Sequence, residues 1–463
     1  MSTVTMSETM ARWDTVTIGE CLRLINGRAF KPAEWSASGR PIIRIQNLNN
    51  PDAPFNYYEG DLPEKFAVSN GDLLFAWSGT PGTSFGAHIW QGNDAWLNQH
   101  IFKVLFSPEQ FDKRFLRYAI NQNLDEYIRA AHGGAGLAHI TKGRFESSAL
   151  PVPSLAEQRH IVAEIERQFT RLDAGIAGLN RAHANLKRYR AAVLKAACEG
   201  TLVPTEAALA RAEGRDYETG EQLLERILTA RRENWTGKGK YKQPAHAQIE
   251  HVRALPEGWV VASVDQLTTV ITSGSRDWSK YYDKGSGTFI MAQNVRMGRL
   301  DLSERQVVGP PVDNRDRVRS QVRANDLLVT IVGANTGDVC RVPTELAEHY
   351  VCQSVALMRP VEPATAPFCE AYMVSDEHGQ ATFAKYIYGQ GRPHLGFDEL
   401  RTTPICIPPL AEQLRIVAEV ERRLSVIDEL EALVETNLAR SGRLRQSILA
   451  KAFSGDLVPA ETV

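Results

Sequence analysis

The chain has 463 residues, 43% of them hydrophobic, and a net charge of −2. This length exceeds what one core holds, so roughly two to four domains are expected. No apolar run reaches the roughly 18 residues that span a bilayer, and residues 1–10 lack an apolar signal core, which predicts a cytoplasmic location. The six cysteines are scattered without a CxxC pair, which predicts buried free thiols rather than zinc ligands or disulfides.

Residues 11–150 have the pattern of a mixed α and β domain. Apolar runs at 41–45, 72–77 and 100–106 alternate with turn residues and predict strands, whose spacing suggests a curled or barrel-like sheet. Helical spacing follows over 108–131. The glycine-rich segment 132–136 then predicts a loop.

A segment of 52 residues occurs twice, at 153–204 and at 408–459, with a constant offset of 255 and 22 identical positions. Such identity indicates a duplication. Ser154 and Glu157 have the spacing of a capping box at the start of the first copy. Each copy continues with apolar residues spaced by three and four, which predicts a long coiled-coil helix. The seam residues are Val162, Ile165, Phe169, Leu172, Ile176, Leu179, Leu186, Val193 and Ala197 in the first copy, interrupted by His183 and Arg190, and Val417, Val420, Leu424, Ile427, Val434, Leu438 and Ile448 in the second.

The segment between the first repeat and the next domain predicts one or two helices over 205–235, with Leu223, Leu224, Ile227 and Leu228 as their apolar face. Residues 236–244 then form a basic, glycine-containing linker. A solvated tether is one interpretation of this linker, and a phosphate contact is the other.

A second mixed domain begins near Leu255 and matches the first in several features. The matching pairs are Trp13 and Trp259, Gln46 and Gln293, Asn47 and Asn294, Asp72 and Asp326, Gln99 and Gln353, and His139 and His394. We therefore predict an α+β protein with a pseudo-twofold internal repeat, in which two mixed α/β domains are separated by two long antiparallel coiled-coil helices. The expected segments are a first domain at 1–152, a first long helix at 153–204, a helical extension and basic linker at 205–254, a second domain at 255–407 and a second long helix at 408–463.

This layout carries a repeated motif at each end of the two helices. Leu-Ala-Glu-Gln stands at the head, at 155–158 and 410–413, and Gly-x-Leu-Val-Pro at the close, at 200–204 and 455–459. Over essentially the whole chain, the arrangement resembles the specificity (S) subunit of type I restriction-modification enzymes. The resemblance implies that each domain is a target recognition domain reading one half of a split DNA sequence. It also implies that the helices set the unread spacer and dock two methyltransferase (M) subunits, which bind S-adenosylmethionine and methylate adenine N6, and that restriction (R) subunits join.

Two physical arguments bear on this resemblance. About 45 helical residues extend roughly 67 Å, and half-sites one DNA turn apart are about 34–36 Å from centre to centre, so such a rod is long enough to hold two readers. Against it, neither residues 1–150 nor residues 255–405 show the basic excess that is usual for a DNA-binding domain. A non-catalytic coiled-coil adaptor that displays two protein-binding domains is therefore kept as the alternative.

Motifs for catalysis are missing from the sequence. We find no Asn/Asp-Pro-Pro-aromatic motif, no GxxxxGK[ST], no HExxH and no GxSxG. The chain is therefore predicted not to be an enzyme and to hold no cofactor or metal. S-adenosylmethionine would bind the M subunits, and ATP and Mg the R subunits.

Residues that recur in both domains are expected to form scaffold or sequence-independent contacts, although a bidentate Gln or Asn contact to adenine in both half-sites is the alternative for Gln46, Asn47, Gln293 and Asn294. Residues that differ between the domains are the candidates for specificity. These are Arg44, Ser78, Thr80, Thr83, Ser84, His100, His139 and Lys142 in the first domain, and Arg276, Trp278, Lys280, Arg296, Asn335, Thr336, Arg392 and His394 in the second. Lys142 and Arg392 precede the long helices, where phosphate contact is plausible, while the shared register of His139 and His394 favours a structural role. Glu157, Gln158, Glu412 and Gln413 are expected either to cap their helices or to contact the M subunit.

Overall fold

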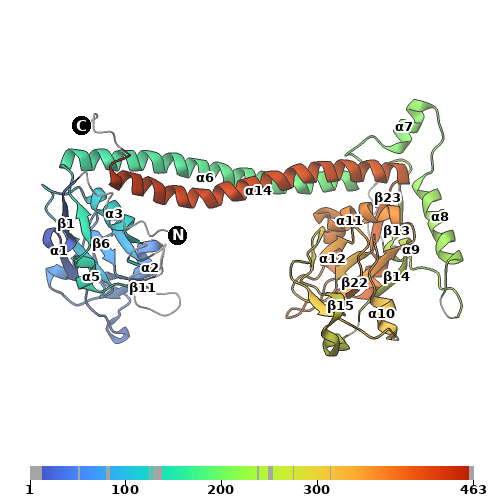
Figure 1. The fold of residues 1–463 in the computed structure, drawn as a ribbon, viewed down its shortest axis with the longest axis horizontal. Coiled ribbons are helices and arrows are strands. Elements are labelled where there is room, and N and C mark those ends of the chain that lie inside the picture. The colour runs from blue at the N-terminus through green and yellow to red at the C-terminus, as the bar shows by residue number, and fades with distance from the viewer. Residues whose placement is uncertain are drawn as a thin grey trace. The chain divides into compact units, whose positions relative to one another are not determined.

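A computed structural model describes residues 13–50, 53–79, 84–124, 127–128, 138–236, 239–248, 254–274, 276–312 and 314–457. The chain divides into two compact units, and both contain parts of the two long helices, α6 (Leu155–Cys198) and α14 (Leu410–Ser454). Unit 1 consists of residues 1–181 and 434–463, and unit 2 consists of residues 182–433. Figure 1 shows that a mixed domain lies against paired helix segments within each unit.

Domain 1, the mixed domain of unit 1, is built on two four-stranded sheets with strand orders β2-β10-β6-β8 and β4-β3-β9-β5. The strand β3 runs parallel to β9, whereas the other neighbouring strands in these sheets pair antiparallel. The bridge between Arg28 and Asn98 connects the two sheets, so the predicted curled sheet is divided in two. The strands are β1 (Thr15–Thr17), β2 (Arg23–Asn26), β3 (Arg40–Ile43), β4 (Asn56–Tyr58), β5 (Ala67–Val68), β6 (Leu73–Ala76), β7 (Ser78–Gly79), β8 (Gly86–Ile89), β9 (Ala95–Leu97), β10 (Ile101–Leu105), β11 (Ala138–His139) and β12 (Ala149–Pro151).

The helices of domain 1 are short. They are α1 (Ile18–Cys21), α2 (Ile45–Asn49), α3 (Lys113–Gln122) and α5 (Lys142–Glu146), with 3-10 turns η1 (Pro32–Glu34) and η2 (Glu64–Phe66). Helix α3 begins after Asp112, whose carboxylate accepts hydrogen bonds from the backbone N–H groups of Arg114 and Phe115. This cap explains why the helix starts later than the predicted 108.

Domain 2, the mixed domain of unit 2, repeats the order of domain 1. Its sheet β14-β22-β19-β20 corresponds to β2-β10-β6-β8, and its sheet β18-β15-β21 again contains one parallel pair, β15 with β21. The strands are β13 (Val260–Ser263), β14 (Thr268–Ser273), β15 (Tyr282–Ile290), β16 (Val295–Arg296), β17 (Arg299–Leu300), β18 (Gln306–Val308), β19 (Leu327–Thr330), β20 (Val339–Arg341), β21 (His349–Val351), β22 (Val355–Pro360) and β23 (Pro404–Ile407).

The helices of domain 2 and of the preceding extension complete unit 2. The extension forms α7 (Glu206–Glu213) and α8 (Gly220–Glu233), as predicted for 205–235. The other elements are α9 (Val264–Leu267), α10 (Arg315–Ser320), α11 (Ala366–Val374), α12 (Ala381–Tyr386), α13 (Phe397–Thr402), the turns η3 (Asp277–Tyr281) and η4 (Pro363–Thr365), and the π-helical turn η5 (Asp376–Gln380). The predicted α+β class with two long helices is confirmed.

Both long helices contribute to the core of each domain. In unit 1, Ile161 and Ile165 of α6 and Ala452 and Phe453 of α14 are buried in the cluster that contains the domain 1 sheet. In unit 2, the core includes Val193, Leu194 and Ala197 of α6 and Ile416 and Val420 of α14. Burial of an apolar side chain contributes about 1.5–3 kcal/mol, so each domain is strongly attached to both helices of its own unit.

Ion pairs show that the two helices run antiparallel. Arg190 of α6 pairs with Asp428 and, at 3.0 Å, with Glu431 of α14 in unit 2. In unit 1 the equivalent pair joins Asp173 of α6 to Arg445 of α14. The residues of these pairs are related by the repeat offset of 255. The aspartate therefore comes from α6 in one pair and from α14 in the other, and the arginine comes from the opposite helix each time. The interruption of the predicted seam at Arg190 is therefore an interhelical contact.

The heads of the two helices are joined to their domains by the repeated Trp and Glu residues. The indole N–H of Trp13 donates to Glu157 at 3.5 Å, and that of Trp259 donates to Glu412 at 2.9 Å. Ser154 and Glu157 form the predicted capping box, in which the Glu157 carboxylate accepts from the Ser154 N–H at 3.0 Å. In the second copy Pro409 stands where Ser154 stands in the first.

Gln158 is fully buried and connects the helix head to domain 1. Its side-chain oxygen accepts from the Asp112 N–H at 2.8 Å, and its amide donates to the carbonyls of Gln110 at 2.7 Å and Pro153 at 3.0 Å. A buried backbone group that loses its partner costs about 1–3 kcal/mol.

We predict that Gln158→Ala lowers the free energy of unfolding of unit 1 by about 1–3 kcal/mol, because one buried and two partly buried backbone groups lose a partner. The neighbouring exposed residue Arg159 provides the control, and Arg159→Ala should change stability by less than about 0.5 kcal/mol. Urea unfolding measures both, and faster amide exchange at Asp112 in Gln158→Ala alone would locate the effect. Equal behaviour of the two variants would contradict this role.

Candidate nucleic-acid interface

The repeated Gln-Asn pair divides into one buried and one exposed residue in both domains. Asn47 accepts from the Arg44 N–H at 3.0 Å and donates to the Ala53 carbonyl at 3.1 Å. Asn294 accepts from the Met291 N–H at 2.9 Å and donates to the carbonyls of Asp301 and Glu304 at 2.9 and 2.6 Å. Both asparagines are buried, so their amides are used to hold loops. Gln46 and Gln293 are exposed and remain candidates for a repeated DNA contact.

The repeated aspartates stabilise equivalent turns. Asp72 accepts from the Ser69 N–H at 2.9 Å and pairs with Lys103 at 2.7 Å. Asp326 accepts from the Arg323 N–H at 2.7 Å and pairs with Arg359 at 2.7 Å. Burial raises the pKa of Asp326, while Arg359 acts in the opposite direction. The two aspartates have the contacts expected of scaffold residues.

Several predicted residues of domain 1 gather around Trp77. The short strands β7 and β11 pair antiparallel and place Ser78 opposite His139. The rings of His100 and His139 lie 5.2 and 6.2 Å from that of Trp77. Next to them, a recess of about 620 Å³ is lined by Asn26, Trp77, Phe102, His139, Ile140, Thr141, Lys142 and Arg144. This surface combines cations, imidazoles and an aromatic ring, which suits contact with nucleic acid.

The imidazole of His100 has a perturbed environment. Its pKa is lowered from the ordinary value of 6.5, first by partial burial and then by the positive charges of His139 and Arg44. These electrostatic effects connect Arg44, which is half-buried on α2's N-terminal side, to the same group of residues. Thr80 and Thr83 lie outside the described residues, and Ser84 is buried.

The corresponding surface of domain 2 is built on the same backbone bridge. His394, which is His139 displaced by the offset of 255, pairs with Val332. Val332 follows Asp326 by six residues, as Ser78 follows Asp72. The ring of Tyr388 stacks on His394 at 5.8 Å, and the two residues exchange backbone hydrogen bonds that close the loop 388–394. Thr336 donates to the Pro393 carbonyl at 3.0 Å, so it is used to hold this loop.

The side chains on this second surface differ from those of the first. Arg392 is exposed, Asn335 is half-buried, and Tyr388 is 60% exposed. The sequence analysis did not single out Tyr388 or its domain 1 counterpart in role, Trp77. Glycine follows each ring within two residues, at Gly79 and at Gly389, and an aromatic residue next to glycine was the signal that could have identified them.

The remaining candidates of domain 2 are distributed over other loops. Arg276 and Lys280 are exposed at the start and within η3, and Arg296 is exposed on β16. Trp278 was wrongly placed among the exposed specificity residues. It is 1% exposed, because its ring packs 5.3 Å from Phe289 and 5.3 Å from Tyr350 in the core.

The residues predicted to contact the M subunit are engaged inside the chain. Gln158, Glu412 and Gln413 are fully buried, and Glu157 is half-buried in the capping box. Burial raises the pKa of Glu412, although its carboxylate also accepts from the Glu206 N–H at 2.8 Å and from Trp259. These contacts favour the structural alternative for all four residues.

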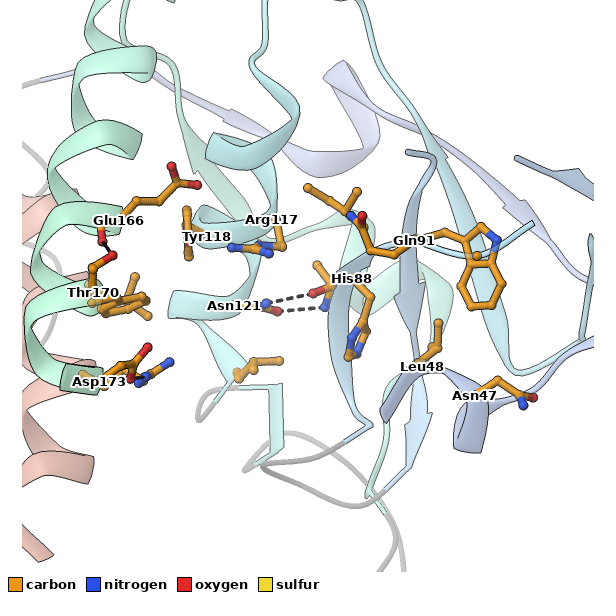
Figure 2. Close-up of a pocket in the computed structure, with 18 of the residues that line it drawn as sticks. Asn47, Leu48, His88, Gln91, Arg117, Tyr118, Asn121, Glu166, Thr170 and Asp173 are labelled. Atoms are coloured by element: carbon orange, nitrogen blue, oxygen red, sulfur yellow. Dashed lines mark hydrogen bonds and ion pairs between the residues drawn. The ribbon is translucent and has the colours of Figure 1, made fainter. Parts of the chain in front are cut away.

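A separate cleft of about 1310 Å³ lies between domain 1 and the helices of unit 1 (Figure 2). Glu166, Thr170 and Asp173 of α6 face Arg117 and Asn121 of α3 across it. The side chain of Asn121 accepts a hydrogen bond from the Ala87 N–H at 2.7 Å and donates one to the Ala87 carbonyl at 2.9 Å, so it occupies the free edge of β8. The arrangement brings no acid, base and nucleophile together among the residues drawn.

In the described part of the chain, no helix is long and apolar enough to cross a membrane, and no group of three or more His, Cys, Asp or Glu residues could hold a metal. All six cysteines are free, and Cys198, Cys340, Cys352 and Cys369 are buried.

Comparisons with known proteins identify the class of this fold. Residues 10–179 match the family described as "Type I restriction modification DNA specificity domain". The Escherichia coli type I restriction enzyme EcoBI specificity subunit is 28% identical over 447 residues, covering 96% of this chain and 86% of that protein. The EcoKI specificity subunit of Escherichia coli strain K12 is 24% identical over 464 residues, covering 96% of this chain and 89% of that protein.

Solved structures show the same fold over nearly the whole chain. The HsdS subunit from Thermoanaerobacter tengcongensis has a TM-score of 0.51 at 19% identity, covering 96% of this chain and 97% of that one. A chain from a study of complex assembly and conformational transition of the type I R-M system has a TM-score of 0.61 at 20% identity, covering 96% and 98%. Over nearly its whole length, the chain is therefore similar to type I restriction-modification specificity subunits. Both Escherichia coli relatives are named specificity subunits, as the resemblance of this sequence implied.

We predict that Asn294→Ala lowers the free energy of unfolding of unit 2 by about 1–3 kcal/mol, because three partly buried backbone groups lose the buried Asn294 amide as their partner. Gln293→Ala, at the adjacent exposed position, should alter stability by less than about 0.5 kcal/mol. Chemical denaturation followed by circular dichroism distinguishes them. A Gln293 variant as unstable as the Asn294 variant would rule out this division of roles.

A second prediction concerns the titration of His100. Because its folded-state pKa lies below the ordinary 6.5, folded unit 1 binds fewer protons than the unfolded chain between these two values. The contribution of His100 to the free energy of unfolding is therefore present above about pH 6.5 and is lost as the pH falls through the lowered pKa. NMR of histidine-labelled protein should show this low pKa, and His139→Gln should raise it by removing a neighbouring charge. An unchanged His100 titration in the variant would show that the two imidazoles are not coupled.

Proposed function

We propose that this chain reads a bipartite DNA sequence for a type I restriction-modification complex, with each domain contacting one half-site. The observation that carries this proposal is the repeated bridge of His139 with Ser78 and of His394 with Val332. In both domains the bridge holds a surface next to an aromatic ring, whereas the surrounding side chains differ. A common frame with different polar residues is what two readers of different half-sites require.

The two long helices would fix the spacer between the half-sites. Each helix enters the core of both domains, and a continuous helix is stiffer than a flexible tether. The helices would also hold two M subunits, with the buried Gln158, Glu412 and Gln413 fixing the helix starts rather than contacting the partner. In this proposal the M subunits carry S-adenosylmethionine and flip the target adenine out of the duplex. R subunits, with ATP and Mg, complete the nuclease, and the complex works in the cytoplasm.

Methylome sequencing of a host that carries this chain with its M subunit tests the proposal. We expect one methylated motif with two specific halves and a fixed unread gap. Exchanging residues 1–152 for the equivalent domain of a relative should change one half only. Binding that ignores half-site spacing would instead favour the adaptor alternative.

The spacer can be tested by lengthening the helices. A heptad inserted in α6 between Ile176 and Tyr189, with a matching heptad in α14, preserves the coiled-coil seam and adds about 10 Å of helix. We predict that the methylated motif keeps the bases of both half-sites, while the unread gap between them lengthens by roughly three base pairs. Replacing one native heptad by seven residues of the same pattern is the control and should leave the gap unchanged. A motif with altered bases in either half would contradict the assignment of reading to the domains.

A further inference from the structure

The segment that begins with the last turn of α8 is strongly basic in a chain of net charge −2. Residues 231–248 contain Arg231, Arg232, Lys238, Lys240 and Lys242 but only one acidic residue, Glu233. A run of this kind is often a solvated connection between domains. The contacts of the described residues argue against that interpretation here.

Two described parts of this segment, Arg231 and residues 244–245, are attached to domain 2. Arg231 donates to the Thr268 carbonyl and to the Tyr241 hydroxyl, each at 2.8 Å, and lies 3.6 Å from Asp265. The Ala245 N–H donates to the same Asp265 carboxylate at 2.8 Å, and Pro244 is buried. The segment is therefore held against the surface instead of spanning freely between domains.

Three other cations of this segment are presented to solvent. Arg232, Lys240 and Lys242 are exposed, and within the described residues none of them forms an ion pair, in contrast to Arg231. Trp235 lies beside them, 38% exposed, with its ring 6.0 Å from that of Tyr241 in an edge-to-face contact. A group of exposed cations next to an exposed aromatic ring suits a polyanion that also offers flat or sugar surfaces.

This surface is distinct from the recognition surface of domain 2. Figure 1 shows α8 beside α9 and β14, whereas α12, which leads into the loop 388–394, lies on the other side of the domain. The basic segment therefore does not belong to the group formed by Tyr388, Arg392 and His394.

We propose that Arg232, Lys240, Lys242 and Trp235 bind the sugar-phosphate backbone of duplex DNA next to the half-site read by domain 2. The proposal rests on the proposed DNA-reading function and adds a sequence-independent contact outside the bases that are read. Phosphate contacts contribute affinity without specifying sequence. Such a contact also explains how a domain without a basic excess retains duplex DNA.

The test uses the full chain assembled with its M subunits and the motif identified by methylome sequencing. Two duplexes of equal length carry the motif, one extended on the domain 2 side and the other on the domain 1 side. The variant combines Arg232→Gln, Lys240→Gln and Lys242→Gln, which are surface changes. Binding constants are measured over a range of salt concentrations, because each phosphate contact contributes about 0.9 to the slope of log K against log salt.

We expect the triple variant to reduce the slope by about 2 to 3 on the duplex extended on the domain 2 side, and to match the wild type on the other duplex. The charge-conserving variant Arg232→Lys, Lys240→Arg, Lys242→Arg should retain the wild-type slope on both. An unchanged slope on the domain 2 duplex would overturn the proposal. An equal loss on both duplexes would overturn it too, since the contact would then lie within the motif.

Two further outcomes separate this inference from its alternatives. If the triple variant loses M subunits while its DNA slope is unchanged, the segment binds an acidic protein surface and the proposal is wrong. If the wild-type complex binds all duplexes without regard to half-site spacing, the proposed reading function fails. In that case the slopes of wild type and triple variant on any long duplex still decide whether these cations contact phosphates.

Discussion

The structure depends on the burial of each long helix in two different cores. The first part of α6 and the last part of α14 are needed to close the core of domain 1, while the last part of α6 and the first part of α14 close the core of domain 2. A two-helix coil leaves most of its surface in water, and α6 is only half-buried or exposed through its middle. Packing against the domains therefore supplies much of the apolar burial that keeps the helix ends in place.

The duplication solves a geometric problem for a single polypeptide. In an antiparallel pair of helices, a residue at one position meets a partner from the opposite end of the other helix. The repeat places the same pair of residue types at two contacts between the helices. Asp173 with Arg445 and Asp428 with Arg190 are therefore equivalent ion pairs. The pairs are exposed enough that each contributes little energy. Their value lies in the register that they select.

Buried and exposed polar groups have different roles in this protein. The buried carboxylates and amides of the repeat, such as Glu412 and Gln158, are used to join helices to domains. Exposed cations lie at Arg392 and at Arg232, Lys240 and Lys242, and within the described residues these four form no ion pair. A near-neutral net charge thus hides local basic regions, and the composition was a poor guide to the partner.

The sequence by itself determined the α+β class, the two long helices and their offset of 255, because hydrophobic periodicity and internal repetition are local properties of the chain. It also separated Asn294, which recurs, from Arg392, which does not. Only the tertiary structure decided that Trp278 is a core residue and that Gln293 is exposed while Asn294 is buried. It alone brought His100, His139 and Trp77 together. Burial and side-chain contact depend on residues far apart in the chain, and no local pattern encodes them.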